Sequence, residues 1–370
     1  MIVGVLKETK EYEYRVALVP SGVSALRKRG HTVVVQAGAG VGSNITDDAF
    51  VAAGAQPASS AAEVAKRAEL LLRVKEPTPD EYALIEPRHT LFTFFHFAAN
   101  RTLMEAMLTR RATCVAYETV EDAHGQLPIL IPMSEVAGRM AVQEGAKYLE
   151  KPTKGKGLLL GGIPGVAPAS VVILGGGVVG SNAAKVAAGL GAEVTVLDVN
   201  LDRLRYLDDI MPKNVTFLMS NEHVINEKLA HADLVICAAL VRGGRTPVLI
   251  TRSQLRTMRS GAVLVDVSID QGGSAETSHP TTHSSPTYIE EGIVHYCVTN
   301  IPGAVPITST YGLTNATLPY ILQLADLGPR EAFRRNPALA RGLNVADGQI
   351  VYQALAESFA LPAVSINAFL

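Results

Sequence analysis

The chain has 370 residues, and its 33 basic residues nearly balance its 35 acidic residues, which gives a formal net charge of −2. Because no block of like charge stands out, neither nucleic acid nor an anionic membrane surface is an expected partner. The length predicts two domains, and hydrophobic residues, at 48% of the chain, are numerous enough to give each domain a core.

The cysteine content and the first residues bear on the cellular location. Three cysteines far apart in the sequence, Cys114, Cys237 and Cys297, fit neither a disulfide framework nor a zinc cluster, and no metal site is expected. The N-terminal stretch MIVGVLKE lacks the basic and apolar regions of a signal peptide, and every apolar run is interrupted well short of a membrane span. We therefore expect a cytoplasmic protein with reduced thiols.

The first part of the chain alternates short apolar, β-branched runs with helical patterns, which is typical of parallel sheets covered by helices on both faces. Strands are expected at residues 2–6, 32–36, 69–74, 90–95 and 113–116. Helices are expected between them, for example at residues 21–29, 61–67 and 102–110. These elements predict a doubly wound domain that carries no glycine-rich phosphate turn.

A second α/β unit is predicted from residue 169 onward. A long helical segment at 134–149 precedes it, and the dense Gly/Pro stretch at 151–168 is typical of a connection. Six strands, the number in a dinucleotide-binding domain, are expected at residues 170–174, 193–197, 215–218, 234–238, 262–267 and 293–298. After Pro302 the pattern turns helical again, at 308–324 and 348–357, and these segments are expected to pack on the first domain.

The strongest local signal is a G-x-G-x-x-G motif that follows an apolar strand and opens an Ala-rich helix. Gly175 would make the tight turn, Gly177 would let the backbone approach a pyrophosphate, and Gly180 would let helix and strand pack closely. The helix N-terminus supplies N–H groups and a positive dipole for the phosphates. Asp198 ends the next strand, where a carboxylate binds the adenine ribose and favours NAD over NADP, while Arg203 would soften that preference.

The predicted architecture is therefore α/β, with two doubly wound parallel-sheet domains. Residues 132–304 would form a Rossmann NAD-binding domain. Residues 1–131 and 305–370 would form a discontinuous substrate domain, with the active site in the cleft between the two.

Four polar residues fall at or just beyond the carboxyl ends of predicted strands, where ligands collect in open α/β sheets. They are Arg15, Lys75, His96 and Asp270. Arginine pairs with a carboxylate through two parallel hydrogen bonds, and a lysine ammonium polarises a carbonyl. Histidine carries protons near neutral pH. Position alone leaves each of the four open between a site residue and an ordinary surface or structural one.

His279 and His283 have the spacing of a metal-binding pair. However, nearby prolines argue against a helix, and neither a cysteine nor a third histidine is near them in the sequence. We interpret this stretch as a loop, either flexible or at the edge of the cofactor.

Taken together, these features resemble the alanine dehydrogenase family along essentially the whole chain. The resemblance is carried by the stretches VGVLKE from Val3, EYRVAL from Glu13, VKEP from Val74, FH at Phe95 with AAN from Ala98, PMSEVAGR from Pro132, LLGGIPGV from Leu159, the glycine turn, VSIDQGG from Val267 and NIPGAVP from Asn300. The pattern has no departure at the four candidate positions.

The resemblance implies an NAD-dependent enzyme that converts L-alanine reversibly into pyruvate and ammonium. Arg15 and Lys75 would bind the substrate, His96 would be the acid/base, and Asp270 would position water or ammonia. Family members are typically cytoplasmic homohexamers, which agrees with a charged fraction of only 18%. Beyond the glycines, Asp198 and Arg203, the expected cofactor contacts are Ser134, Val178, Val179, Ser220, Leu240, Val267, Ile269, Asp270 and Asn300.

Two relatives with other functions remain as alternatives. The NAD-binding subunit of a transhydrogenase shares the architecture but passes hydride to a partner domain beside a membrane-spanning segment, and this sequence contains no such segment. A saccharopine dehydrogenase-like enzyme would take a larger substrate, but the stretches around Arg15, His96 and Asp270 favour alanine dehydrogenase.

Overall fold

The computed structural model describes residues 1–239 and 246–370. The chain divides into two compact units: unit 1 comprises Met1–Met133 and Val305–Leu370, and unit 2 comprises Ser134–Ala304. Each unit is built on its own mostly parallel sheet, so the predicted α/β class with two doubly wound sheets is confirmed. The predicted cofactor contact Leu240 lies outside the described residues.

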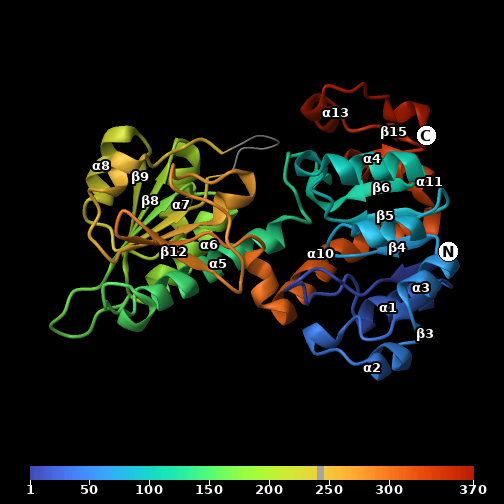
Figure 1. The fold of residues 1–370 in the computed structure, drawn as a ribbon, viewed down its shortest axis with the longest axis horizontal. Coiled ribbons are helices and arrows are strands. Elements are labelled where there is room, and N and C mark those ends of the chain that lie inside the picture. Colours follow the sequence, from blue (N-terminus) through green and yellow to red (C-terminus); the bar gives the residue numbers. More distant parts are fainter. Residues whose placement is uncertain (240–245) are drawn as a thin grey trace. The chain divides into compact units, whose positions relative to one another are not determined.

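Unit 1 contains an eight-stranded sheet with the order β15-β14-β6-β5-β4-β1-β2-β3 (Figure 1). The strands β1 to β6 run parallel, while β14 is antiparallel to β6 and β15 is antiparallel to β14. Their bounds are β1 Ile2–Val5, β2 Thr32–Gln36, β3 Gln56–Ala58, β4 Leu70–Leu72, β5 Thr90–Thr93, β6 Thr113–Ala116, β14 Leu343–Ala346 and β15 Gln349–Ile350. The strands β3, β14 and β15 were not predicted.

The predicted helix at 348–357 is wrong in its first half. Asp347 and Gly348 both have positive φ, 49° and 79°, which suits a tight hairpin turn between β14 and β15. The helix α13, Gln353–Phe359, begins only after this hairpin. Pairing with β14 therefore decides the conformation of residues 349–350, and β14 is itself placed at the sheet edge by its tertiary pairing with β6.

Helices cover both faces of the unit 1 sheet. Alternate strand residues point to opposite faces, so Val3 and Leu70 belong to one core cluster, whereas Val34 and Leu71 belong to the other. The first cluster receives residues of α1 and α10, and the second receives residues of α3, α4 and α13. The helices of this unit are α1 Pro20–Lys28, α2 Asp47–Ala52, α3 Ala61–Arg67, α4 Arg101–Arg110, α10 Pro306–Leu327, α11 Pro329–Arg335, α12 Pro337–Arg341 and α13.

Unit 2 contains a seven-stranded sheet with the order β12-β13-β11-β10-β7-β8-β9. The six parallel strands are those predicted for a dinucleotide-binding domain, and the antiparallel edge strand β12 was not predicted. The bounds are β7 Ser170–Leu174, β8 Glu193–Asp198, β9 Val215–Met219, β10 Leu234–Cys237, β11 Val263–Asp266, β12 Thr287–Glu290 and β13 Ile293–Tyr296.

In unit 2 the helix α5 precedes β7, and the other helices lie between the strands in the chain. Most of α5 belongs to this unit, because the division between the units falls after Met133, within that helix. In the described ranges every helix is too short or too polar to cross a membrane. The bounds are α5 Ile131–Tyr148, α6 Val178–Gly189, α7 Leu201–Ile210, α8 Glu222–Leu229 and α9 Arg252–Leu255.

The returning helix α10 is expected to be essential for unit 1. Ile321 is fully buried in the first core cluster, whereas Ile307 on the same helix is 50% exposed. Ile321→Ala should therefore lower the free energy of unfolding by about 2–5 kcal/mol, because it leaves a cavity. The matched control Ile307→Ala should change it by less than about 0.5 kcal/mol. Urea denaturation measures both, and equal losses would contradict this view of α10.

Candidate active site

Three of the four predicted chemical residues lie at one edge of the unit 1 sheet. The order of its parallel strands is β3-β2-β1-β4-β5-β6, so the connections leave in opposite directions from β1 and from β4. Ligands bind at such a reversal, outside the carboxyl ends of the strands. Arg15 lies on the segment after β1, Lys75 follows β4, and His96 follows the neighbouring strand β5.

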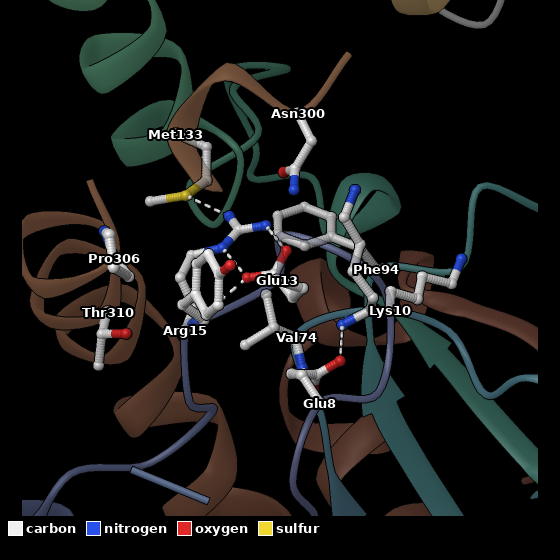
Figure 2. Close-up of polar contacts among 12 residues, drawn as sticks. Glu8, Lys10, Glu13, Arg15, Val74, Phe94, Met133, Asn300, Pro306 and Thr310 are labelled. Carbon is white, nitrogen blue, oxygen red and sulfur yellow. Dashed lines mark hydrogen bonds and ion pairs between the residues drawn. The ribbon is translucent and has the colours of Figure 1, made fainter. Parts of the chain in front are cut away.

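Arg15 is held by a carboxylate that the sequence reading missed. Its Nε donates to Oε1 of Glu13 at 2.6 Å, and its Nη2 donates to Oε2 at 2.5 Å, a two-pronged ion pair with both side chains almost fully buried. The Nη1 group points at the Met133 sulfur, 3.0 Å away (Figure 2). This pairing fixes the plane of the guanidinium, which a carboxylate ligand requires.

The returning helix α10 supports the backbone of the same segment. The Val16 amide donates to Oγ1 of Thr310 at 3.1 Å, and the Ser43 hydroxyl lies 2.7 Å from that oxygen. Ser43 also donates to the carbonyl of Tyr14 at 2.9 Å. Residues on both sides of the unit 2 insertion therefore build the Arg15 segment.

Lys75 is half-buried, and its backbone is bound by a second carboxylate that was not predicted. Oε1 of Glu8 accepts from the Val74 amide at 2.7 Å, and Oε2 accepts from the Lys75 amide at 3.3 Å. Burial raises the pKa of the Glu8 carboxyl to about 7; the nearby Arg73 guanidinium offsets part of this effect, and the Glu13 charge adds to it.

His96 is exposed and lies in a strained turn. Its φ of 50° is in the left-handed region, which costs a residue other than glycine on the order of 1 kcal/mol. Both the Phe95 and the His96 amides donate to the Glu118 carboxylate, the latter at 2.6 Å, and this stabilises the turn. The imidazole stacks on the Phe94 ring with the centroids 5.8 Å apart. The turn thus presents the imidazole outward at the carboxyl edge of the sheet.

In unit 2 the glycine motif forms a close-packed turn between β7 and α6. Gly175 has a φ of 105°, and a Cβ atom at Gly180 would lie 1.8 Å from the Gly175 carbonyl oxygen, so neither position accepts a side chain. A Cβ atom at Gly177 would meet nothing within 4 Å. Val178 and Val179 lie in the first turn of α6, where the backbone N–H groups have no partner within the helix. The turn is therefore open to a ligand only on the side of Gly177.

Asp198 and Arg203 both bind this turn. The Asp198 carboxylate accepts from the Gly176 amide at 2.6 Å, and Arg203 Nε donates to the Gly176 carbonyl at 2.6 Å. Ser220 follows β9 beside them, because its amide donates to the Asp198 carbonyl at 2.9 Å. The negative charge of Asp198 therefore lies where the second strand of a dinucleotide fold binds the adenine ribose, and Arg203 is joined to the glycine turn itself.

A buried aspartate shapes the loop that carries Asp270. Oδ2 of Asp266, at the end of β11, accepts from the Ser274 amide at 2.7 Å and from the Ser278 hydroxyl at 2.6 Å, and Oδ1 accepts from the Ser268 amide at 3.0 Å. Burial raises the pKa of Asp266, and these hydrogen bonds oppose the shift. Asp270 itself is exposed, on the short 3₁₀ turn of residues 267–271 that also contains the predicted contacts Val267 and Ile269.

The last predicted contacts of unit 2 lie on α5 and beyond β13. Ser134 is half-buried on α5, and Asn300 has a left-handed φ of 62°. The Asn300 carbonyl lies 3.2 Å from Nε2 of His283. His279 instead stacks on Tyr288, with the ring centroids 3.7 Å apart. The two histidines that resembled a metal pair are thus engaged with different partners, and one of them contacts the Asn300 loop.

Comparisons with known proteins agree with this geometry. Residues 4–137 match the family model described as the N-terminal domain of alanine dehydrogenase/PNT, and residues 141–353 match that of its C-terminal domain. The chain belongs to the alanine dehydrogenase/PNT family. Family membership covers both units, and the glycine turn lies in the C-terminal domain match.

Individual relatives are similar over nearly the whole length. An alanine dehydrogenase from Methanococcus maripaludis is 52% identical over 98% of this chain and 97% of its own. A solved L-alanine dehydrogenase structure matches with a TM-score of 0.94 and 49% identity, over 97% of this chain and 99% of that one. A transhydrogenase from Sinorhizobium meliloti matches with a TM-score of 0.80 and 25% identity, over 96% and 100% of the two chains.

The buried Glu8 should make stability depend on pH. Its folded-state pKa of about 7 lies above the ordinary 4.5, so the folded protein favours the protonated form of Glu8. The stability that this preference contributes is complete below about pH 4.5 and is lost as the pH rises through about 7. Glu8→Gln cannot ionise, and should gain stability relative to the parent protein by on the order of 3 kcal/mol between about pH 5 and about pH 8. Urea denaturation at the two pH values measures this, and a difference independent of pH would contradict it.

The open side of the glycine turn gives a second prediction. Gly177→Ala should keep the melting temperature, because its methyl group meets no protein atom, yet weaken NADH binding at least about tenfold by blocking the approach of the pyrophosphate. Gly189→Ala, which adds a methyl group with equal space at the end of α6, is the control: it should leave NADH binding unchanged and keep or slightly raise the melting temperature, because alanine favours the helix. NADH titration and thermal melting measure the two quantities. Normal NADH binding by Gly177→Ala would show that the pyrophosphate does not approach the backbone at Gly177.

Proposed function

We propose that this protein is an NAD-dependent L-alanine dehydrogenase, which converts L-alanine reversibly into pyruvate, ammonium and NADH. The observation that carries the proposal is the full-length similarity, at about half identity, to proteins named alanine dehydrogenase. The geometry of each unit supports it, because unit 1 gathers cations and an imidazole at a strand reversal, and unit 2 presents a dinucleotide turn.

The residues of unit 2 fit NAD. The side-chain-free turn at Gly175, Gly177 and Gly180 suits a pyrophosphate, and the Asp198 carboxylate suits the ribose hydroxyls while repelling a 2′-phosphate. Further contacts are proposed from residues placed along the carboxyl edge of the same sheet and on α5, namely Ser134, Val178, Val179, Arg203, Ser220, Val267, Ile269, Asp270 and Asn300. NAD supplies the hydride acceptor, which no side chain of the protein provides.

The residues of unit 1 suit a small amino acid and its keto product. Arg15, fixed by Glu13, would bind the carboxylate, and Lys75 would bind the carboxylate and carbonyl end of the substrate. His96, held outward by its turn, would exchange the proton of the carbinolamine oxygen when water adds to or leaves the substrate carbon. Asp270 would position that water or the ammonia.

The cellular form is part of the proposal. We infer a cytoplasmic homohexamer from the family resemblance. The exposed apolar side chains of the segment 158–168 support this inference. Leu159, Ile163 and Val166 are 66%, 59% and 55% exposed in the single chain, and a contact with another subunit would bury them. Analytical ultracentrifugation of the purified protein tests the subunit number.

An assay of both directions tests the activity. The absorbance of NADH is followed with L-alanine and NAD, and in reverse with pyruvate, ammonium and NADH. Turnover in both directions, with the reverse reaction lost when ammonium is left out, is expected. A protein that binds NADH but is silent in both assays would instead favour a transhydrogenase-like hydride carrier, the alternative that the Sinorhizobium meliloti structure supports.

The proposed role of His96 gives a sharper expectation. His96→Ala should bind NADH almost normally, since the imidazole lies in unit 1, but turn over at least about a hundredfold more slowly, because the proton carrier is lost. His89 provides a matched control, because it is fully buried and its Nε2 lies 2.9 Å from the Ala65 carbonyl. His89→Ala should therefore lower the free energy of unfolding, while the folded variant should turn over much faster than His96→Ala. Near-normal turnover of His96→Ala would remove His96 from the mechanism.

A further inference from the structure

One acidic side chain at the edge of the unit 1 sheet has no role in the proposed chemistry so far. Glu8 follows β1 by three residues, and its side chain is only 1% exposed. A buried carboxylate is costly unless hydrogen bonds and charges compensate it. The position of Glu8 at the strand reversal, directly beside the Lys75 segment, indicates why this cost is retained.

The two carboxylate oxygens of Glu8 bind consecutive main-chain N–H groups. Oε1 accepts from Val74 at 2.7 Å and Oε2 from Lys75 at 3.3 Å, so the loop after β4 is fixed to the loop after β1. The Val74–Lys75 segment is also joined to the residues that follow β5, because the Val74 carbonyl accepts from the Phe94 amide at 3.2 Å. Phe94 in turn stacks on the His96 imidazole.

The charged and titratable groups that face Glu8 come from several elements. Arg73, at the end of β4, is 3.7 Å away, too far for a hydrogen bond, and its Nη1 donates to Glu81 at 2.5 Å. Glu13 on the loop after β1 repels the Glu8 charge and so raises the pKa of Glu8. The Glu8 charge in turn adds to the effect of burial in raising the pKa of Tyr117, which lies beyond β6. Arg73 therefore shares its charge between two carboxylates, and only one of them touches the Lys75 backbone.

We propose that Glu8 is a positioning residue for the substrate: its ionised carboxylate holds the Val74–Lys75 backbone so that Lys75 is presented to the substrate at the carboxyl edge of the sheet. This inference rests on the proposed function. An amide at this position has one acceptor oxygen and turns N–H donors toward the other backbone N–H, so the glutamine variant loses one of the two contacts. A protonated carboxyl group loses an acceptor in the same way.

The test compares Glu8→Gln with Glu81→Gln. Both variants remove a negative charge that faces Arg73, but only Glu8 binds the Lys75 backbone. For Glu8→Gln we expect the KM for L-alanine and for pyruvate to rise about tenfold or more, with the Kd for NADH within about twofold of the parent value. For Glu81→Gln we expect both KM values to stay within about twofold. An unchanged KM in Glu8→Gln, or an equal rise in both variants, would overturn the proposal.

The pH profile separates positioning from a general loss of structure. Since the pKa of Glu8 is raised to about 7, the parent KM should rise as the pH falls through about 7, and Glu8→Gln should lack that component. If Glu8→Gln does not fold, Glu8→Asp keeps the charge with a shorter reach, and should raise KM while retaining the pH component. A pH component of equal size in the parent and in the Glu8→Gln variant, or an unchanged KM in Glu8→Asp, would overturn the proposal. A parent protein without alanine turnover defeats the proposed function itself, whereas an active parent with an unaffected variant defeats only this inference.

Discussion

The reversal of strand order beside the first strand of each sheet is the constraint on which the rest of the structure depends. In unit 1 the reversal lies between β1 and β4, and in unit 2 it lies between β7 and β10. Connections leave the two strands in opposite directions there, so the carboxyl edge is not covered by a crossing helix. Both candidate sites lie at this edge, and each unit fills it with a different kind of chemistry.

Unit 2 builds its site mainly from backbone, and unit 1 builds its site from charged side chains. The glycine turn offers N–H groups and space, which suit phosphates of any nucleotide, and under the proposed function Asp198 would add the selection for a ribose with free hydroxyls. In unit 1, by contrast, Glu13 orients Arg15, and Glu118 holds the strained turn at His96. Under the proposed function, a dinucleotide would be bound through features shared by many enzymes, whereas the small substrate would be selected by side chains particular to unit 1.

Buried carboxylates in unit 1 lower stability in return for a fixed arrangement of cations. Glu8 is fully buried with Arg73 at 3.7 Å, and removal from water outweighs that attraction in setting its pKa. The strained φ of His96 is a second local cost at the same edge. Strain and buried charge gathered at one edge of an otherwise apolar sheet are typical of a site whose geometry matters more than its stability.

The sequence by itself determined the elements whose signal is local. Apolar β-branched runs predicted most of the parallel strands of both sheets, and the motif at Gly175 to Gly180 predicted the turn, because steric demands on glycine act over a few residues. Only the tertiary structure decided the strands β14 and β15 and the long-range contacts that support the Arg15 and Lys75 backbones. Glu8 meets Lys75, and Thr310 meets Val16, across long stretches of chain. A carboxylate that binds distant backbone N–H groups leaves no pattern in its own neighbourhood, so these contacts exist only once the strands are ordered.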